Sequence, residues 1–167
     1  TDYFPVLGDD LIAVYQATAG PAGQEGIRTH FAIREWLNRR PAAHLVSASL
    51  FWKPANASES EFPSLGREVL ENPGKSGIRS RVNDPWQHYV EPLLEGARRL
   101  RERRPDVVFR VYLAADLDFL IGELTDAGCE IALMDGSSLL HNPGAMWRFL
   151  AMEGPETVTV IDADRAP

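Results

Sequence analysis

The chain has 167 residues, with 17 lysines and arginines against 24 aspartates and glutamates, which gives a formal net charge of −7. This length suffices for one domain with a real core and hardly for two. The negative charge argues against a general nucleic-acid-binding protein. No apolar run approaches the roughly 20 residues of a membrane-spanning helix. We therefore expect no membrane span and, because the first residues show no signal-peptide pattern, a cytoplasmic location.

Residues 1–43 are interpreted as an N-terminal strand and helix extension that precedes the main domain. Within it, Leu11–Ala17 is a short apolar run typical of a strand, and Ile27–Arg39 has the pattern of a helix that Pro41 stops. His44–Trp52 (HLVSASLFW) is the next predicted strand, where we place the start of the main domain, residues 44–167.

The rest of the chain alternates between helix and strand patterns after a long loop rich in Pro, Gly, Ser and charge. Connections of such length are usually functional or disordered. In the following helix, Asp84 is the predicted N-cap and Pro85 the first residue. Asp116 is likewise expected to cap a helix, which Gly128 closes. In chain order the predicted elements are the loop Lys53–Asn83, a helix from Asp84 to Arg104, a strand Val107–Ala114, a helix Asp116–Ala127, a strand Cys129–Met134, a helix Pro143–Met152 and a strand Thr157–Ile161.

This alternation predicts an α/β fold, specifically a Rossmann-like, mainly parallel sheet with helices on both faces. In such sheets, ligands bind beyond the carboxyl ends of the strands. Several charged residues follow the predicted strands directly, and their convergence at one edge of the sheet is the main reason to expect a binding site there. These residues are Lys53, Asp116, Asp135, Asp162 and Asp164.

The last two of these residues form an Asp-x-Asp pair after an apolar strand. On an extended segment, carboxylates at i and i+2 point to the same side, roughly 7 Å apart. Both could then reach one hard divalent cation, which prefers oxygen ligands and leaves positions for substrate phosphates. The competing interpretation of Asp162 and Asp164 is a solvated acidic turn. A phosphohydrolase signature would need Thr or Val at position 166, which is Ala166.

Other motifs give weaker signals. Asn72–Gly77 resembles a phosphate-binding loop, but the P-loop pattern needs glycine at position 69, which is Val69. The four histidines lack metal-ligand spacing. The single Cys129 opens an apolar strand and is interpreted as a small core residue. The basic run Arg98–Arg104 is interpreted as a solvated helix end, where cations are favourable.

Two segments carry a family resemblance. Pro143-Gly-Ala-Met-Trp-Arg-Phe-Leu150 and Val160-Ile-Asp-Ala-Asp-Arg165 resemble glycosyltransferase-like proteins of the GT-A type, in which a MWRFL helix precedes a strand ending in RDADSR. The helix from Tyr89 to Pro105 and the strand Phe109–Tyr112 look like the same family's preceding elements, so the resemblance covers about residues 44–165. The chain departs from the pattern by Val-Ile before the pair and Ala166 after Arg165.

The resemblance implies a nucleotide-sugar site in the N-terminal, donor-binding half of such an enzyme. It implies that Asp162 and Asp164 hold Mn²⁺ or Mg²⁺ on the diphosphate of the donor, and that Lys53 and Asp116 line the nucleotide pocket. Arg148 either pairs near the nucleotide or forms a salt bridge of its helix, and the neighbouring Trp147 is expected in the core. We expect the acceptor-binding half to be missing, because a GT-A enzyme normally continues past its metal motif.

A non-enzymatic alternative remains open. A degenerate α/β module with a solvated acidic strand end would expose a sheet edge and an uncovered face, both suited to self-association or to a partner chain. The two hypotheses differ in their dependence on metal: only the glycosyltransferase-like protein should be stabilised by Mn²⁺ together with a nucleoside-diphosphate sugar.

Overall fold

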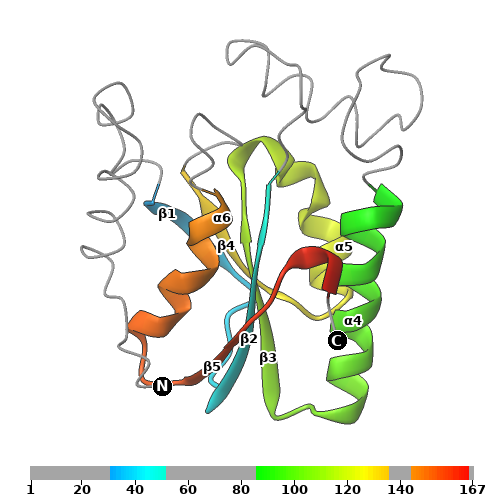
Figure 1. Cartoon of the computed structure of the whole chain (residues 1–167), viewed down its shortest axis with the longest axis vertical. Coiled ribbons are helices and arrows are strands. Elements are labelled where there is room, and N and C mark those ends of the chain that lie inside the picture. Colours follow the sequence, from blue (N-terminus) through cyan, green and yellow to red (C-terminus); the bar gives the residue numbers. More distant parts are fainter. Residues whose placement is uncertain (1–30, 52–85, 136–143, 166–167) are drawn as a thin grey trace.

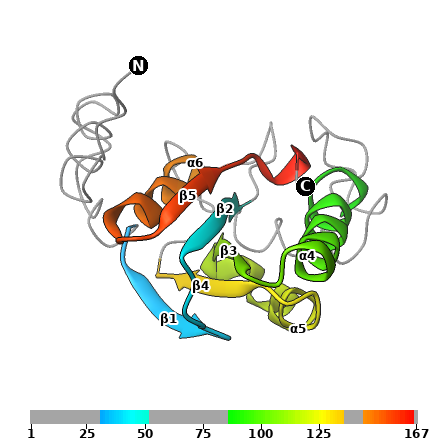
Figure 2. The same ribbon diagram turned by 90° about the horizontal axis from the view of Figure 1, so that it is seen from below.

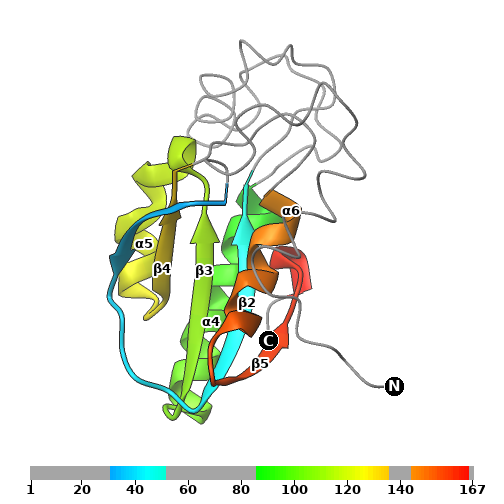
Figure 3. The ribbon, with the colours of Figure 1, turned by 90° about the vertical axis from the view of Figure 1, so that its left-hand side faces the viewer.

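The computed structural model describes residues 31–51, 86–135 and 144–165. Within these ranges, five strands form one sheet in the order β1-β4-β3-β2-β5, visible side by side in Figure 3. Strands β2 to β5 are mutually parallel, whereas β1 is antiparallel to β4. The strands are β1 (Ile33–Leu37), β2 (His44–Leu50), β3 (Val107–Leu113), β4 (Glu130–Met134) and β5 (Thr157–Val160). The predicted α/β, Rossmann-like class is confirmed.

Helices cover both faces of this sheet (Figure 2). Helices α4 and α5 pack on one face, and α6 with the following 3₁₀ helix η4 packs on the other, against β2 and β5. The helical elements are η2 (Trp86–Val90), α4 (Glu91–Arg103), η3 (Ala115–Leu120), α5 (Ile121–Asp126), α6 (Gly144–Trp147), η4 (Arg148–Glu153) and η5 (Ala163–Arg165). In the part of the chain that is described, no helix is long and apolar enough to cross a bilayer.

Most of the predicted elements that fall in the described ranges are confirmed, with small changes of boundary. The predicted helix Ile27–Arg39 is wrong over its second half, because residues 33–37 form the edge strand β1. The spacing of Ile33, Trp36 and Leu37 is that of a helix, but pairing with β4 overrides it. This strand lies within the predicted 1–43 extension and belongs to the same sheet as the main domain. The strand Leu11–Ala17, the loop Lys53–Asn83 and the cap Asp84 lie outside the described residues.

Local sequence features explain the start of helix α4 and the end of helix α5. Pro92 occupies the first turn of α4, where a missing N–H costs nothing, and Leu93, Leu94 and Ala97 give the helix its buried stripe. Gly128 follows α5 with a φ of 88°, a left-handed conformation that glycine adopts without strain. Asp116 does not cap its helix as expected: it lies inside the first turn of η3, which continues into α5.

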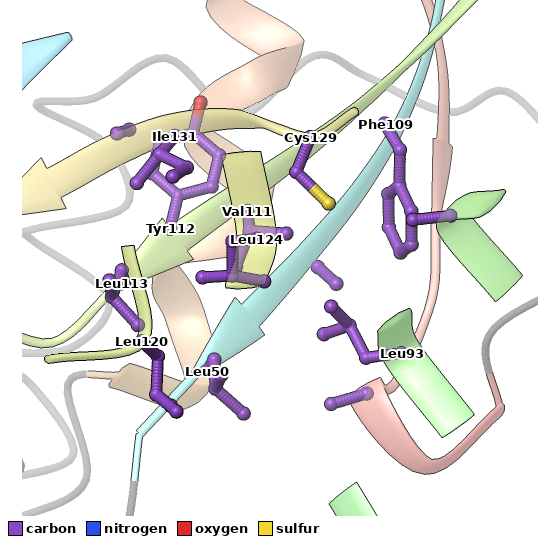
Figure 4. Packing of buried hydrophobic residues seen from close by; sticks show 14 of the residues in the cluster. Leu50, Leu93, Phe109, Val111, Tyr112, Leu113, Leu120, Leu124, Cys129 and Ile131 are labelled. Atoms are coloured by element: carbon purple, nitrogen blue, oxygen red, sulfur yellow. The ribbon is translucent and has the colours of Figure 1, made fainter. Parts of the chain in front are cut away.

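One part of the core lies between the sheet and helices α4 and α5. Figure 4 shows Leu50, Phe109 and Leu113 from the strands meeting Leu93 and Leu124 from the helices. All five side chains are buried. Cys129 is fully buried at the start of β4, which confirms its interpretation as a core residue. Burial raises the pKa of its thiol from 9.0 to about 12, so the thiol is inert at neutral pH.

The opposite face of the sheet holds buried polar residues among buried apolar ones such as Tyr112 and Trp147. Ser47, Arg110 and Glu130 lie opposite one another on β2, β3 and β4, and all three are buried. The Arg110 Nε donates to Glu130 Oε1 at 2.6 Å, and the Arg40 backbone N–H donates to Glu130 Oε2 at 3.2 Å. The ring of Trp36 on β1 lies 4.9 Å from the Arg110 guanidinium. This buried ion pair therefore ties the edge strand β1 to the rest of the sheet.

Candidate ligand site at the switch point of the sheet

The order of the strands contains one reversal. From β2 the chain moves outward to β3 and then to β4, and it returns to place β5 on the other side of β2. In doubly wound sheets, the crevice beyond the carboxyl ends at such a switch point is where ligands bind. Asp162 lies two residues past the end of β5, and η5 (Ala163–Arg165) follows it. In Figure 1 this last turn, coloured red, lies between β2 and α4, and both elements contact it.

Asp162 is exposed and is held by an arginine from the neighbouring helical segment. Its side chain is 55% exposed, and its Oδ1 accepts a hydrogen bond from Nη1 of Arg148. The same nitrogen donates to the carbonyl of Ile161 at 3.3 Å. Arg148 thus forms a salt bridge with Asp162, which lies outside its own helix, and the expected pairing of Arg148 near a nucleotide stays a prediction.

Two buried serines fix the backbone of Arg148. The Arg148 N–H donates to Ser49 Oγ at 2.8 Å, and Ser47 Oγ donates to the Arg148 carbonyl at 2.8 Å. Trp147, just before it, is fully buried and meets the edge of the Phe51 ring, with the ring centroids 6.5 Å apart. The core position expected for Trp147 is confirmed. The start of η4 is therefore anchored to β2 beside the candidate site.

Asp164 does not share an extended segment with Asp162. Strand β5 ends at Val160, and Asp164 lies in η5, which a hydrogen bond from the Arg165 N–H to the Asp162 carbonyl closes at 3.0 Å. The expectation that both carboxylates project from one extended strand is wrong. The Oδ2 of Asp164 lies 3.9 Å from Nε2 of His88 on η2. The two carboxylates thus face partners from different elements.

The other predicted site residues in the described ranges follow the carboxyl ends of other strands. Asp116 follows β3 and Asp135 follows β4, which places them about 10 and about 14 Å from β5 at the usual strand spacing. Asp135 Oδ1 accepts a hydrogen bond from the Arg34 Nε at 3.1 Å, on the far side of the sheet. Lys53 lies outside the described residues. The structure therefore brings Arg148, Asp162 and Asp164 to the switch point and leaves Asp135 away from it.

The described residues offer few protein ligands for a metal ion at the switch point. Among the described residues, no cluster of three or more His, Cys, Asp or Glu side chains could hold a metal ion. Asp162 and Asp164 alone give two carboxylates. One or two carboxylates are the usual protein share of an Mg²⁺ site, in which water and substrate phosphates complete the coordination. In the structure these two carboxylates face Arg148 and His88, respectively.

Sequence reasoning missed Ser47, Ser49 and His88. The two serines had a detectable signal, because they stand at i and i+2 of an otherwise apolar strand and so face the same side. Such alternation within a buried strand predicts polar partners on that face. His88 gave no signal, since its proximity to Asp164 depends on how η2 and η5 pack.

We compared the chain with known proteins. No family model, no curated protein and no solved structure matched it.

Proposed function

We propose that this chain binds a nucleoside-diphosphate sugar at the switch point of its sheet, as the donor-binding part of a GT-A-like glycosyltransferase. One observation carries the proposal: the Asp162/Asp164 pair lies immediately beyond the carboxyl end of β5, next to β2, where the strand order reverses. That position is where α/β sheets bind nucleotides. The acceptor of the sugar is left unassigned.

In this proposal each residue at the site has a defined role. Asp162 and Asp164 hold Mn²⁺ or Mg²⁺ against the diphosphate. The metal would supply Lewis-acid stabilisation of the charge that develops on the leaving diphosphate. Arg148 adds a second positive group at the same place, on a backbone that Ser47 and Ser49 hold in position. Arginine is suited to this role because its planar fork can donate two parallel hydrogen bonds to a phosphate.

A thermal-shift experiment tests the proposal. Mn²⁺ with a saturating UDP- or GDP-sugar should raise the melting temperature of the wild-type chain, because a ligand that binds only the folded state stabilises it. At 100 times the dissociation constant the gain is about 2.7 kcal/mol, or roughly 5–10 °C for a chain of this size. The variants Asp162→Asn and Asp164→Asn should lose most of that shift.

The matched control is Asp106→Asn. Asp106 is an exposed aspartate that also pairs with an arginine, Arg104, but it precedes β3 at the opposite end of the sheet. This control should keep the full ligand-dependent shift. If folded wild-type protein shows no shift with any UDP- or GDP-sugar, or if Asp106→Asn loses it as fully as Asp162→Asn, the proposed site is wrong.

The interaction-module hypothesis keeps one supporting observation. Among the described strands β5 pairs only with β2, so Thr157–Val160 forms an edge of the sheet. Edges of this kind can pair with a strand of another chain. Light scattering on the thermal-shift samples separates the two functions: a concentration-dependent oligomer without any metal-dependent shift would favour the interaction module.

A further inference from the structure

The ion pair between Arg148 and Asp162 occupies an oxygen that the proposed metal site needs. We infer that Arg148 and the metal ion compete for Asp162, and that a diphosphate removes this competition by drawing the Arg148 guanidinium to itself. Metal and diphosphate would then bind cooperatively, and the metal alone would bind weakly. This inference rests on the proposed function, since it describes how that same site is filled.

The contacts of Arg148 fix its backbone and leave its side chain able to move. Its backbone N–H and carbonyl are both tied to β2 through Ser49 and Ser47, which are 5% and 0% exposed. Its side chain is 22% exposed, and that of Asp162 is 55% exposed. A change of partner therefore needs only a rotation of the partly exposed side chain, while the backbone of η4 stays in place.

The Arg148 guanidinium also has an N–H donor without an acceptor among the described residues. Its Nη1 serves both Asp162 and the Ile161 carbonyl, whereas its Nε is buried and has no hydrogen-bond partner among the described residues. A guanidinium carries five N–H donors in a fixed plane. A diphosphate carries several charged acceptors, so once the side chain rotates it can accept from donors that Asp162 leaves unused.

Electrostatics makes the competition mutual. A divalent cation and a guanidinium repel each other, so placing the cation on Asp162 weakens the hold of Arg148 on the same carboxylate. An exposed ion pair of this kind contributes little to stability, so exchange is easy. By linkage, whatever removes Arg148 from Asp162 tightens the metal, and the metal in turn tightens whatever binds Arg148.

Titration of Mn²⁺ alone, followed by the EPR signal of the free ion, tests the competition. Arg148→Gln should tighten Mn²⁺ binding roughly 2- to 5-fold relative to wild type, because it frees Asp162. The matched control is Arg165→Gln, which removes one positive charge next to Asp164 while the backbone contact of residue 165 to the Asp162 carbonyl remains. The control should show the smaller gain.

Titration of inorganic pyrophosphate without metal, followed by ³¹P NMR, tests the second half of the inference. Wild type should bind pyrophosphate, and Arg148→Gln should lose roughly tenfold or more in affinity, the loss of a charge-assisted contact. Arg165→Gln should lose less. If Arg148→Gln does not fold, the Nε–Hε resonance of Arg148 in the wild-type chain should shift when pyrophosphate is added.

The outcomes distinguish this inference from the proposed function. If wild type binds Mn²⁺ with a nucleotide sugar but Arg148→Gln behaves like Arg165→Gln in both titrations, the competition is refuted and the proposed function stands. An Nε–Hε resonance that pyrophosphate leaves unmoved also refutes it. If wild type binds neither Mn²⁺ nor any nucleotide sugar, the proposed function fails and this inference fails with it.

Discussion

Replacing Glu130 with Met should destabilise the fold by about 3–5 kcal/mol, because it leaves the Arg110 guanidinium buried without its carboxylate. The side chains of Arg110 and Glu130 are 7% and 0% exposed, so water cannot replace the lost partner. The loss is a large fraction of the whole stability of a typical domain, which lies at about 5–15 kcal/mol. Urea denaturation of the wild type and the variant measures the difference in the free energy of unfolding.

The double variant Arg110→Met/Glu130→Met distinguishes the energetic effect of the ion pair from that of the packing around it. Because exchange of a buried pair for apolar residues of similar volume is often neutral or favourable, we expect it to recover most of the loss. The control pair is Arg104 and Asp106, which is exposed, so Asp106→Asn should leave the urea midpoint unchanged. A Glu130→Met variant as stable as the control would show that the pair is unimportant to the fold.

Stability should fall steeply above pH 9, through two buried groups that resist ionisation. Burial raises the pKa of Cys129 from 9.0 to about 12 and is also the largest cause that raises the pKa of Tyr112 from 10.0 to about 12. In the unfolded chain both groups lose their protons near their ordinary pKa values. Between those values and about 12 the folded state holds protons that the unfolded state has released, so each pH unit costs about 1.4 kcal/mol per group.

The loss should begin near pH 9 with Cys129 and steepen above pH 10 as Tyr112 adds to it, reaching several kcal/mol by pH 12. Urea midpoints measured at intervals from pH 8 to pH 11 follow the decline. Cys129→Ala should remove the loss of stability that begins near pH 9. Tyr112→Phe should remove the additional loss above pH 10. Equal slopes in wild type and in both variants would contradict the assignment.

The parallel part of the sheet could be predicted because its signals are local. Strands β2, β3 and β4 are β-branched or apolar runs bounded by Pro and Gly, and α4 has an apolar stripe at helical spacing. Strand β1 could not, since its residues Ile33–Leu37 carry a helical pattern and become a strand only by pairing with β4, about a hundred residues further on. From residue 144 on, the predicted helix Pro143–Met152 is present, but it divides into the α-helical turn α6 and the 3₁₀ helix η4.

The place of the candidate site could be predicted better than its contacts. The acidic pair lies beyond the end of β5 as the strand pattern indicated, and the expected role of Asp162 and Asp164 stays a prediction. The partners Arg148 and His88 come from segments whose approach is decided by tertiary packing. The same holds for the anchor from Ser47 and Ser49 to Arg148, which joins residues about a hundred positions apart.

Paramagnetic broadening of amide NMR signals by Mn²⁺ is the most direct test of the proposed site. With a UDP- or GDP-sugar present, Mn²⁺ should first broaden the amides of Ile161, Asp162 and Asp164. The amides of Arg104 and Asp106 should stay sharp, because they lie at the other end of a seven-residue strand that spans roughly 23 Å. Asp162→Asn should abolish the selective broadening. Broadening that is uniform, that centres on Asp135, or that survives in Asp162→Asn would contradict a metal-dependent nucleotide-sugar site at the switch point.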